Sequence, residues 1–457
     1  MNVSVMPVRS EGLRRQLGLA SATAAVAGES IAVGIFLTPA GMAKSLGSPL
    51  WLLVVWITVG TLALCGALCY GELAARFPRN GGIYVYLLET CGRRIAFLYG
   101  WMCLLVLDPG LTAALAVGLA SYAAYVFPMS ALGIKLVAIA VIWALCILNI
   151  LSIRVSAGFL RWTTWLKLGV LGLLVAWALA FRLGSWSNFV PFAAQHPGSL
   201  ALLPALGAAM VGAFFSFGGW WDVSKNAGEV RDPGRTLPRA MVLGVLVVTA
   251  VYILVSAVFL YLVPLARVTS DETFVAQAGA ILFGPAGGVV FAAIVVVCVL
   301  SSLAALIMSA PRVYYAMAQD GLFLHAVARA HPRFGTPANA ILIQGLVASV
   351  LVSIGSFQQI ISYFIFVAVV FLTLTGASLF IVRSRNQDAV PAFLTPVYPL
   401  PLVVFLVLMS MLLLLLVLHS PRQALLGTAV VLAGLPVYSA FQRKGTMRAS
   451  TADELAR

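Results

Sequence analysis

The sequence predicts an all-α membrane protein with about twelve transmembrane helices, in which two inverted repeats of five helices are followed by two more helices. Three observations support this fold class. Of 457 residues, 62% are hydrophobic and only 9% are charged, so the chain is too apolar for a soluble protein. Lys and Arg gather in alternate loops, and two apolar segments in matching positions are interrupted by glycine.

The apolar runs between charged or Pro/Gly-rich breaks define the helices in order, because a helical span needs roughly 20 residues. We expect spans at 16–43, 49–71, 95–126, 133–152, 157–181, 203–227, 238–263, 286–315, 338–355, 359–382, 398–418 and 423–441. Tight turns join the third span to the fourth and the eleventh to the twelfth, so a count of eleven or thirteen stays open. No separate soluble domain fits in the remaining sequence.

The basic residues predict the orientation of the chain. With the N-terminus in the cytoplasm, the inner segments hold 22 of the 28 Lys and Arg residues, and the outer segments hold five. This asymmetry follows the positive-inside rule. The net charge of +14 therefore indicates membrane topology and argues against nucleic acid as a partner. We expect a multi-pass protein of the plasma (inner) membrane with both termini in the cytoplasm.

Glycines interrupt the first and the sixth span. The first contains "AGESIAVGIF" with Gly28 and Gly34, and the sixth contains "FFSFGGWWD" with Gly218 and Gly219. Close helix packing is one explanation of such glycines. Their matched positions, five spans apart, favour two broken helices at a binding site, since free backbone groups in lipid are tolerated only in a cavity or against a ligand. Facing half-helix ends suit a zwitterion, because they offer N–H groups to an anion and carbonyl groups to a cation.

The matched breaks also divide the chain. The expected parts are a cytoplasmic tail at 1–15, a first repeat at 16–182, a second repeat at 203–384, two further helices at 398–441 and a second cytoplasmic tail at 442–457.

Several stretches resemble a known family in the same order along nearly the whole chain. They are "GESIAVGIFLTP" (28–39), "YGELAARFPRNGGIYVYLLETCGRRIAFLYGW" (70–101), "FFSFGGWWDVSKNAGEVRDPGRTLPRAMVLG" (214–244), "SAPRVYYAMAQDGLF" (309–323), "HPRFGTPANAI" (331–341) and "GLPVYSAF" (434–441). The chain resembles the amino acid–polyamine–organocation (APC) superfamily of transporters, and within it the L-type amino-acid transporter branch. This resemblance implies a LeuT-like fold and alternating access around a central site.

The resemblance also implies which residues bind the substrate. Helix 1 would contribute free N–H groups for a carboxylate, and both unwound stretches would contribute carbonyl groups for an amine. The corresponding positions are Ile31, Ala32, Val33, Gly34, Phe215, Ser216, Phe217, Gly218, Gly219 and Trp221. Phe215 matches the aromatic residue that closes over the substrate, although the same ring in a lipid-facing position is the alternative.

Two departures from the family pattern bear on the substrate. The family usually has glycine and serine where this chain has Ala32 and Val33, so a hydroxyl that could hold a carboxylate is missing. Trp221 stands where the L-type branch often has a smaller polar residue. Both changes argue against assigning an ordinary large neutral amino acid as the substrate.

Lys167 lies about ten residues into the fifth span, where a bare ammonium costs several kcal/mol. It matches a lysine that family members carry, and it lies near the place where sodium binds in sodium-coupled relatives of the wider fold. An ammonium group that stands in for that ion predicts transport that is independent of sodium. Two roles of Lys167 stay open: permanent structural hydrogen bonds to the carbonyl groups of helix 1, and a part in proton coupling. Ser301 and Ser302 on the eighth span either face the same place or bond to their own helix.

Two carboxyl groups are further candidates for coupling. Asp108, within the third span, replaces the arginine of a frequent Arg-Pro pair of the family. A carboxylate at that depth needs a partner or a proton, so Asp108 is a proton relay, a counter-charge to Lys167, a contact for a cationic substrate or a structural group. Glu29 lies on the cytoplasmic half of helix 1 and either lines the inner path or is fixed by the inner loops.

The remaining polar residues indicate structural roles and not metal binding or catalysis. Four acidic residues at the inner ends of helices are expected to form an inner gate or fold-stabilising salt bridges: Glu72, Asp222, Glu229 and Asp232. The six cysteines and four histidines have no metal-binding or disulfide spacing, and no catalytic constellation is present. We expect no metal, no cofactor and no enzymatic activity.

The predicted function is secondary active transport of an amino acid, or a close amine or carboxylate relative, by sodium-independent exchange or proton symport. A non-transporting sensor of the same fold, a transporter of another amine and a channel are the alternatives.

The resemblance also bears on a protein partner. Animal L-type members bind a single-span subunit through a cysteine between spans 3 and 4. The corresponding turn, "YVFPMSALG", has no cysteine, so we expect no disulfide-linked heavy subunit.

Overall fold

A computed structural model describes residues 13–32, 34–195, 199–265, 278–354, 357–385, 390–419 and 421–439. Within these ranges the chain is helical and has no strand; its one β-bridge joins Leu17 to Val230. The longer helices before the midpoint are α1 (Leu19–Ser30), α2 (Gly34–Leu46), α3 (Pro49–Arg76), α4 (Ile83–Cys91), α5 (Arg93–Met102), α6 (Asp108–Val126), α7 (Ala131–Leu151), α8 (Ile153–Ala180) and α9 (Leu202–Phe217). They are followed by α10 (Pro233–Leu262), α12 (Gly287–Ser309), α13 (Pro311–Gln319), α14 (Ala338–Ile354), α15 (Phe357–Ser384), α16 (Leu400–His419) and α17 (Pro421–Leu432).

These helices account for the predicted spans and confirm an all-α membrane fold. In the described ranges, nine helical segments are long and apolar enough to cross a membrane. The shorter α14, the pair α1 and α2, and α17 lie at the predicted ninth, first and twelfth spans. The predicted third span is composite, because a π-helical turn at Cys103–Leu107 joins α5 to α6. Such a turn shifts the register of a helix and commonly lies at functional sites.

Both predicted helix interruptions are present. The chain leaves the helical conformation between Ser30, the end of α1, and Gly34, the start of α2; Val33 lies outside the described residues. In the sixth span, α9 ends at Phe217, and after a turn the short 3-10 helix η3 covers Asp222–Glu229. Helices 1 and 6 are therefore broken, as the paired glycines predict.

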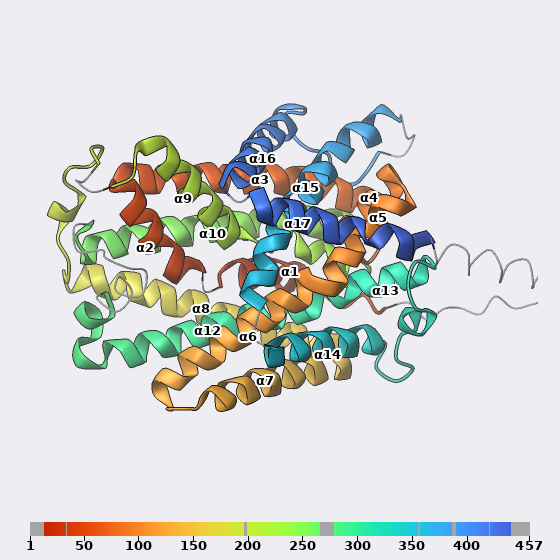
Figure 1. Ribbon diagram of the computed structural model, residues 1–457, viewed down its shortest axis with the longest axis horizontal. Helices are drawn as coiled ribbons and strands as arrows, with labels where there is room; N and C mark the ends of the chain where they lie inside the picture. The colour runs from red at the N-terminus through yellow and green to blue at the C-terminus, as the bar shows by residue number, and fades with distance from the viewer. Residues whose placement is uncertain are drawn as a thin grey trace, which may run out of the picture.

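In Figure 1, α1 lies near the middle of the bundle, and α2 and α9 lie to its left. α1 packs against α8, α10 and α12, and α2 packs against α9. α10 packs along α3. The hydroxyl of Tyr252 on α10 binds the backbone at both interruptions. Its Oη lies 2.7 Å from the carbonyl oxygen of Ser30 and 2.6 Å from that of Ser216. Its ring meets Trp56 of α3 edge-on, which fixes the hydroxyl at this position.

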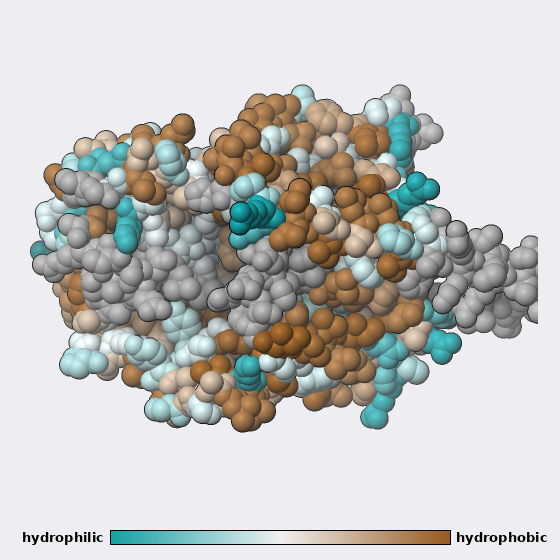
Figure 2. All heavy atoms as spheres, viewed as in Figure 1, coloured by the Kyte–Doolittle hydropathy of each residue, from teal (hydrophilic) through white to brown (hydrophobic). Residues whose placement is uncertain are grey.

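The outer surface is apolar, as expected for a protein that faces lipid. Hydrophobic side chains cover much of the face shown in Figure 2. Large apolar residues on several helices are more than half exposed, among them Leu136 on α7, Trp165 on α8 and Val407 on α16. A soluble protein rarely exposes continuous apolar surface on this scale, whereas a bilayer covers it without penalty.

Candidate functional site

The two breaks open onto one cavity of about 160 Å³ in the middle of the molecule. α6, α12 and α15 complete its walls. The residues that line it from the broken helices are Glu29, Ser30, Ala32, Gly34, Phe214, Phe215, Ser216, Gly218, Gly219, Trp221, Asp222 and Lys225. Segments separated by almost 200 residues of sequence thus enclose a volume suited to a small molecule.

Most of the residues predicted to bind substrate line this cavity. Ala32, Gly34, Phe215, Ser216, Gly218, Gly219 and Trp221 are in its wall. Ile31 and Phe217 are fully buried and do not line it. The ring of Phe217 packs between Trp56 and Tyr252, with ring centroids 6.1 and 5.0 Å away. The side chains of these two residues therefore support the breaks. The backbone groups of Ile31 are also occupied, because its N–H donates to Ala27 and its carbonyl oxygen accepts from Lys167 and Ser302.

Lys167 of α8 contacts the backbone at the break in helix 1. Its Nζ donates to the carbonyl oxygen of Gly28 at 2.8 Å and to that of Ile31, and lies 3.2 Å from Ser302 Oγ. Ser302 Oγ in turn lies 2.7 Å from the Gly28 carbonyl oxygen. The last carbonyl groups of α1 have no partner within their helix, and the lysine and the serine supply partners for them.

Gly34 brings the two broken helices into contact. A Cβ at Gly34 would lie 2.7 Å from Ser216 Oγ, so a larger residue would separate α2 from α9. Ser216 Oγ is also 2.7 Å from Thr38 Oγ1 of α2. The first turn of α2 and the last turn of α9 are thereby held together at the cavity.

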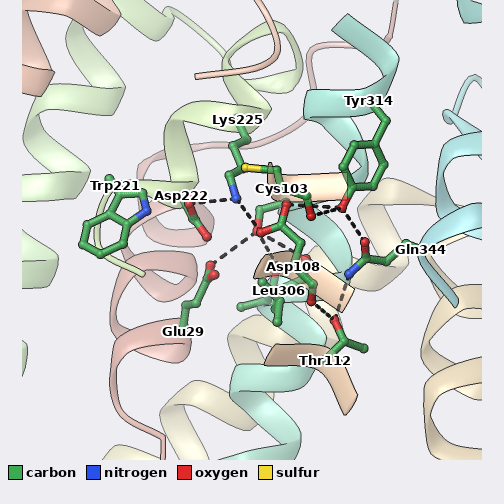
Figure 3. Close-up of polar contacts among 12 residues, drawn as sticks. Glu29, Cys103, Asp108, Thr112, Trp221, Asp222, Lys225, Leu306, Tyr314 and Gln344 are labelled. Atoms are coloured by element: carbon green, nitrogen blue, oxygen red, sulfur yellow. Dashed lines mark hydrogen bonds and ion pairs between the residues drawn. The ribbon is translucent and has the colours of Figure 1, made fainter. Parts of the chain in front are cut away.

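Asp108 forms a buried ion pair with Lys225 of η3. Their Nζ–Oδ1 distance is 3.2 Å, and Lys225 is also 3.0 Å from Asp222 Oδ1 (Figure 3). Of the roles left open for Asp108, the structure does not show a counter-charge to Lys167, because the ammonium beside Asp108 belongs to Lys225. Lys225, counted among the basic residues of the inner segments, has a side chain only 2% exposed and lines the cavity.

A chain of hydrogen bonds through Tyr314, Gln344 and Thr112 also supports Asp108. Tyr314 Oη lies 3.3 Å from Asp108 Oδ2 and 2.6 Å from Gln344 Oε1. Gln344 Nε2 donates to Thr112 Oγ1, which donates to the backbone carbonyl of Asp108. All four side chains are buried, so the network fixes the carboxylate at the end of the π-helical turn.

Glu29 faces the same charged cluster from helix 1. Its Oε2 accepts a long hydrogen bond of 3.4 Å from Ser309 of α12. Gly219 makes room for it, because a Cβ on that glycine would lie 2.6 Å from Glu29 Cγ. The cavity wall therefore carries three carboxyl groups, from Glu29, Asp108 and Asp222, and one ammonium group, from Lys225. Such an imbalance attracts protons or a positively charged group.

Aromatic rings also line the cavity. Phe215 remains 48% exposed although it lines the cavity, so its ring has room to move. Phe214 and Trp221 stack across the break in helix 6, with ring centroids 6.4 Å apart and planes inclined by 22°. Trp221 thus acts as a wall of the cavity and narrows it.

Ion pairs gather at the end of the molecule that contains the loops predicted to lie on the inner side. Arg312 of α13 makes a bidentate contact with Glu229, at 3.0 and 3.1 Å, and both side chains are fully buried. Glu72 binds Arg76 and Arg383. Arg79 donates to Asp320 at 2.7 Å, and Tyr84 donates to the same carboxylate. Burial and the neighbouring Asp320 raise the pKa of Tyr84 above its ordinary value, so its hydroxyl keeps its proton.

The predicted inner acidic residues divide into two groups. Glu72 and Glu229 form buried ion pairs between elements, as expected for a gate or a structural lock. Asp222 pairs with Lys225 within η3 and lines the cavity, and Asp232 is exposed at the start of α10. Among the described residues, no group of His, Cys, Asp and Glu side chains has the geometry to hold a metal ion.

Four residues that line the cavity or support its wall are absent from the site expected from the sequence. Lys225, Asp222, Tyr314 and Gln344 all belong to the charged cluster or its support. A signal for Lys225 is present in retrospect, since "WWDVSK" places an acid and a base three residues apart inside an apolar span. For Tyr314 and Gln344 nothing in the sequence pattern points to Asp108, because they lie more than 200 residues away from it.

Comparison with known proteins connects this geometry to a family. The model of a family described as amino acid permease matches residues 17–439 of the chain. The serine/threonine exchanger SteT of Bacillus subtilis (strain 168) is 29% identical over 447 residues, which cover 96% of this chain and 99% of the exchanger.

Mammalian transporters are similar over the same length. The b(0,+)-type amino acid transporter 1 of Mus musculus is 27% identical, covering 95% of this chain and 89% of its own. The large neutral amino acids transporter small subunit 2 of Rattus norvegicus is 28% identical, covering 93% of this chain and 80% of its own. The similarity therefore extends over the helices that enclose the cavity, and all three relatives are named for amino acids that they move.

Proposed function

Since the chain belongs to the amino acid permease family and is an amino acid transporter of the APC superfamily, we propose that its central cavity is the substrate site. Transport proceeds by alternating access, without sodium, as exchange or proton symport. The observation that carries this proposal is that the first turn of α2 and the last turn of α9 border the same small cavity. Helix ends at a cavity are suited to charged groups of opposite sign.

The substrate carboxylate binds at the start of α2. Gly34 lines the cavity there, and the free N–H groups of a first helical turn attract an anion. The amine binds toward α9 and the carboxyl groups of Glu29 and Asp222. Without a serine next to Gly34, the carboxylate depends on backbone donors and on Ser30, whose buried Oγ has no hydrogen-bond partner in the described part of the chain.

Lys167 supports sodium independence. Its ammonium is fully buried against two carbonyl groups of helix 1, so a fixed positive charge already satisfies them. A sodium ion at the same place would meet strong repulsion from that charge. Uptake in proteoliposomes is expected to be unchanged when external sodium is replaced by choline, and a dependence of uptake on sodium would contradict the proposal.

Coupling to protons is assigned to Asp108 and Glu29, with Lys167 as the third candidate. The two carboxyl groups face Lys225 and Asp222, so a change in the proton count of this cluster changes the charge that a substrate meets. Proton symport predicts that an inward pH gradient drives accumulation. Exchange predicts that internal substrate accelerates uptake without a gradient, so the two forms are distinguished in the same vesicles.

A second candidate substrate is an amine that is not an amino acid. The excess of carboxyl groups over ammonium groups in the cavity favours it. A thermal-shift screen of amino acids, amines and small carboxylates on the purified protein separates the two, followed by uptake of the compounds that stabilise it. If amines stabilise the protein and no amino acid does, the amine is the substrate.

The proposal extends to the organisation of the chain. The first repeat comprises 16–182 and the second 203–384, with helices at 398–441 outside the repeats and cytoplasmic tails at 1–15 and 442–457. The protein lies in the plasma (inner) membrane with both termini in the cytoplasm, which the distribution of Lys and Arg supports. It acts without a disulfide-linked heavy subunit, because the turn between α6 and α7 contains no cysteine. A shift in mass on reduction of the native complex would contradict this.

A further inference from the structure

A second cavity, of about 170 Å³, lies away from the substrate site, where the start of α8 meets the segment before α1. Three arginines line it: Arg154 and Arg161 of α8, and Arg231, which follows η3. All three are exposed, and in the described part of the chain their guanidinium groups make no hydrogen bond or ion pair. Three unpaired positive charges around one hollow favour an anion with several oxygen atoms.

The surroundings of this cavity are those of a membrane surface. Arg154, Gly158, Arg161 and Trp165 follow one another at spacings of four, three and four, so they share one face of α8. Trp165 is 65% exposed and its neighbour Trp162 is 62% exposed. Arg161 lies only about 12 Å along the helix from its first residue. Exposed tryptophans next to basic residues at a helix end are typical of the headgroup region.

We propose that the cavity among Arg154, Arg161 and Arg231 binds the phosphodiester headgroup of an anionic phospholipid. The arginines bind the phosphate oxygens, and Gln16 and Ser21 in the cavity wall offer neutral donors. The exposed rings of Trp162 and Trp165 continue the site toward the acyl chains. A free phosphate would meet the same arginines but would leave those rings uncovered, so the lipid is the better occupant. This inference does not depend on the identity of the transported substrate.

The site is connected to the closure of the inner side. The N–H groups of Gln16 and Leu17 donate to the carbonyl oxygen of Glu229 at 2.7 and 2.9 Å, and the N–H of Arg231 donates to Leu17 at 2.8 Å. Gln16, Leu17 and Arg231 all line the cavity. A bound headgroup therefore ties α8 to the segment that covers η3, and it stabilises these three backbone hydrogen bonds.

Native mass spectrometry of the detergent-solubilised full chain tests the proposal. The wild type is titrated with phosphatidylglycerol, with phosphatidylcholine and with inorganic phosphate. We expect one phosphatidylglycerol to bind more tightly than phosphatidylcholine. Arg154→Gln with Arg161→Gln is expected to weaken it about 30-fold, since each basic residue near an anionic headgroup contributes about a factor of five. Arg235→Gln is the matched control, because Arg235 is exposed, follows Arg231 by four residues and does not line the cavity.

A second variant keeps all three charges. A Cβ at Gly158 would meet no heavy atom within 4 Å, so a side chain can leave the helix there, and Gly158→Leu adds bulk to the cavity. This variant is expected to lose the bound lipid while its melting temperature stays close to that of the wild type. Hydrogen exchange at the amides of Gln16, Leu17 and Arg231 is expected to slow with phosphatidylglycerol and not with phosphatidylcholine.

Three results would overturn the proposal. Equal binding of the two lipids would remove the headgroup preference. An effect of Arg235→Gln as large as that of the double variant would show general attraction to surface charge. Displacement of phosphatidylglycerol by millimolar inorganic phosphate would identify a soluble anion as the occupant.

Discussion

Lys225 Nζ lies 3.2 Å from Asp108 Oδ1, and this buried ion pair joins the interrupted sixth span to the third span at the cavity proposed to bind substrate. Both groups are almost completely shielded from water, since their side chains are 2% and 1% exposed. Because η3 and α6 contribute one charge each, a movement of either element changes the charge balance in the cavity wall.

The first prediction concerns this pair. Lys225→Met is expected to destabilise the protein by about 3–5 kcal/mol, because it leaves the carboxyl groups of Asp108 and Asp222 buried without their ammonium. Asp108→Asn is expected to cost less, because Lys225 keeps its contact with Asp222. Combining Asp108→Asn with Lys225→Met leaves one of these carboxyl groups instead of two and is expected to restore part of the melting temperature while uptake stays abolished. Asp232→Asn, at an exposed carboxylate, is the control for charge removal. Full uptake by the double variant would exclude a role of the pair in transport.

The second prediction concerns Lys167. Lys167→Ala removes the donor for the carbonyl groups of Gly28 and Ile31 and is expected to destabilise the break by about 1–3 kcal/mol and to abolish uptake. Lys135→Ala removes a half-buried lysine that donates to the carbonyl oxygen of Ser353, away from the cavity, and is expected to leave uptake unchanged. Uptake and melting temperature are measured on both. If Lys167→Ala retains full uptake driven by a pH gradient, Lys167 has no part in proton coupling.

The third prediction concerns Gly219, whose φ of 101° favours glycine. Gly219→Ala strains the turn and places a methyl group 2.6 Å from Glu29 Cγ, so we expect about 1–3 kcal/mol of destabilisation and at least a tenfold loss of uptake. Gly172→Ala, on the helical α8 with open space around it, is expected to be neutral or slightly stabilising. Circular dichroism melting curves and initial uptake rates compare the two variants.

The fourth prediction concerns Phe215. If its ring closes over the substrate, Phe215→Ala is expected to raise KM several-fold with little effect on melting temperature, because the ring is 48% exposed. Leu203→Ala, at an 81% exposed position on the same helix, is the control and is expected to leave KM unchanged. An unaltered KM in Phe215→Ala would assign the ring to a lipid-facing role.

Much of the fold could be predicted from the sequence because its causes are local or statistical. Apolar runs of sufficient length form spans in lipid, and basic residues remain on one side. The interruptions at Gly28–Gly34 and Gly218–Gly219 are visible as glycines in apolar sequence. The depth of Lys167 follows from counting along a helix, and its contacts with carbonyl groups of helix 1 agree with the structural hydrogen bonds considered from the sequence.

The site was predictable only in part. The resemblance to the APC superfamily identifies the stretches that border the cavity, but it does not tell which side chains face inward. Ile31 and Phe217 belong to the right stretches, yet their side chains are packed against other helices. On a broken helix the regular period of 3.6 residues is lost, so the direction of a side chain follows from local backbone angles and from packing.

The sequence by itself determined the class of protein: an all-α membrane transporter, interrupted at two matched positions, with ionisable groups within its spans. Only the tertiary structure decided the partners of those groups. It pairs Asp108 with Lys225, supports Asp108 through Tyr314 and Gln344, and gathers Arg154, Arg161 and Arg231 around a separate cavity. The physical reason is range: hydropathy and helix breaks act within about 20 residues, whereas an ion pair between residues 117 positions apart exists only after the helices have packed.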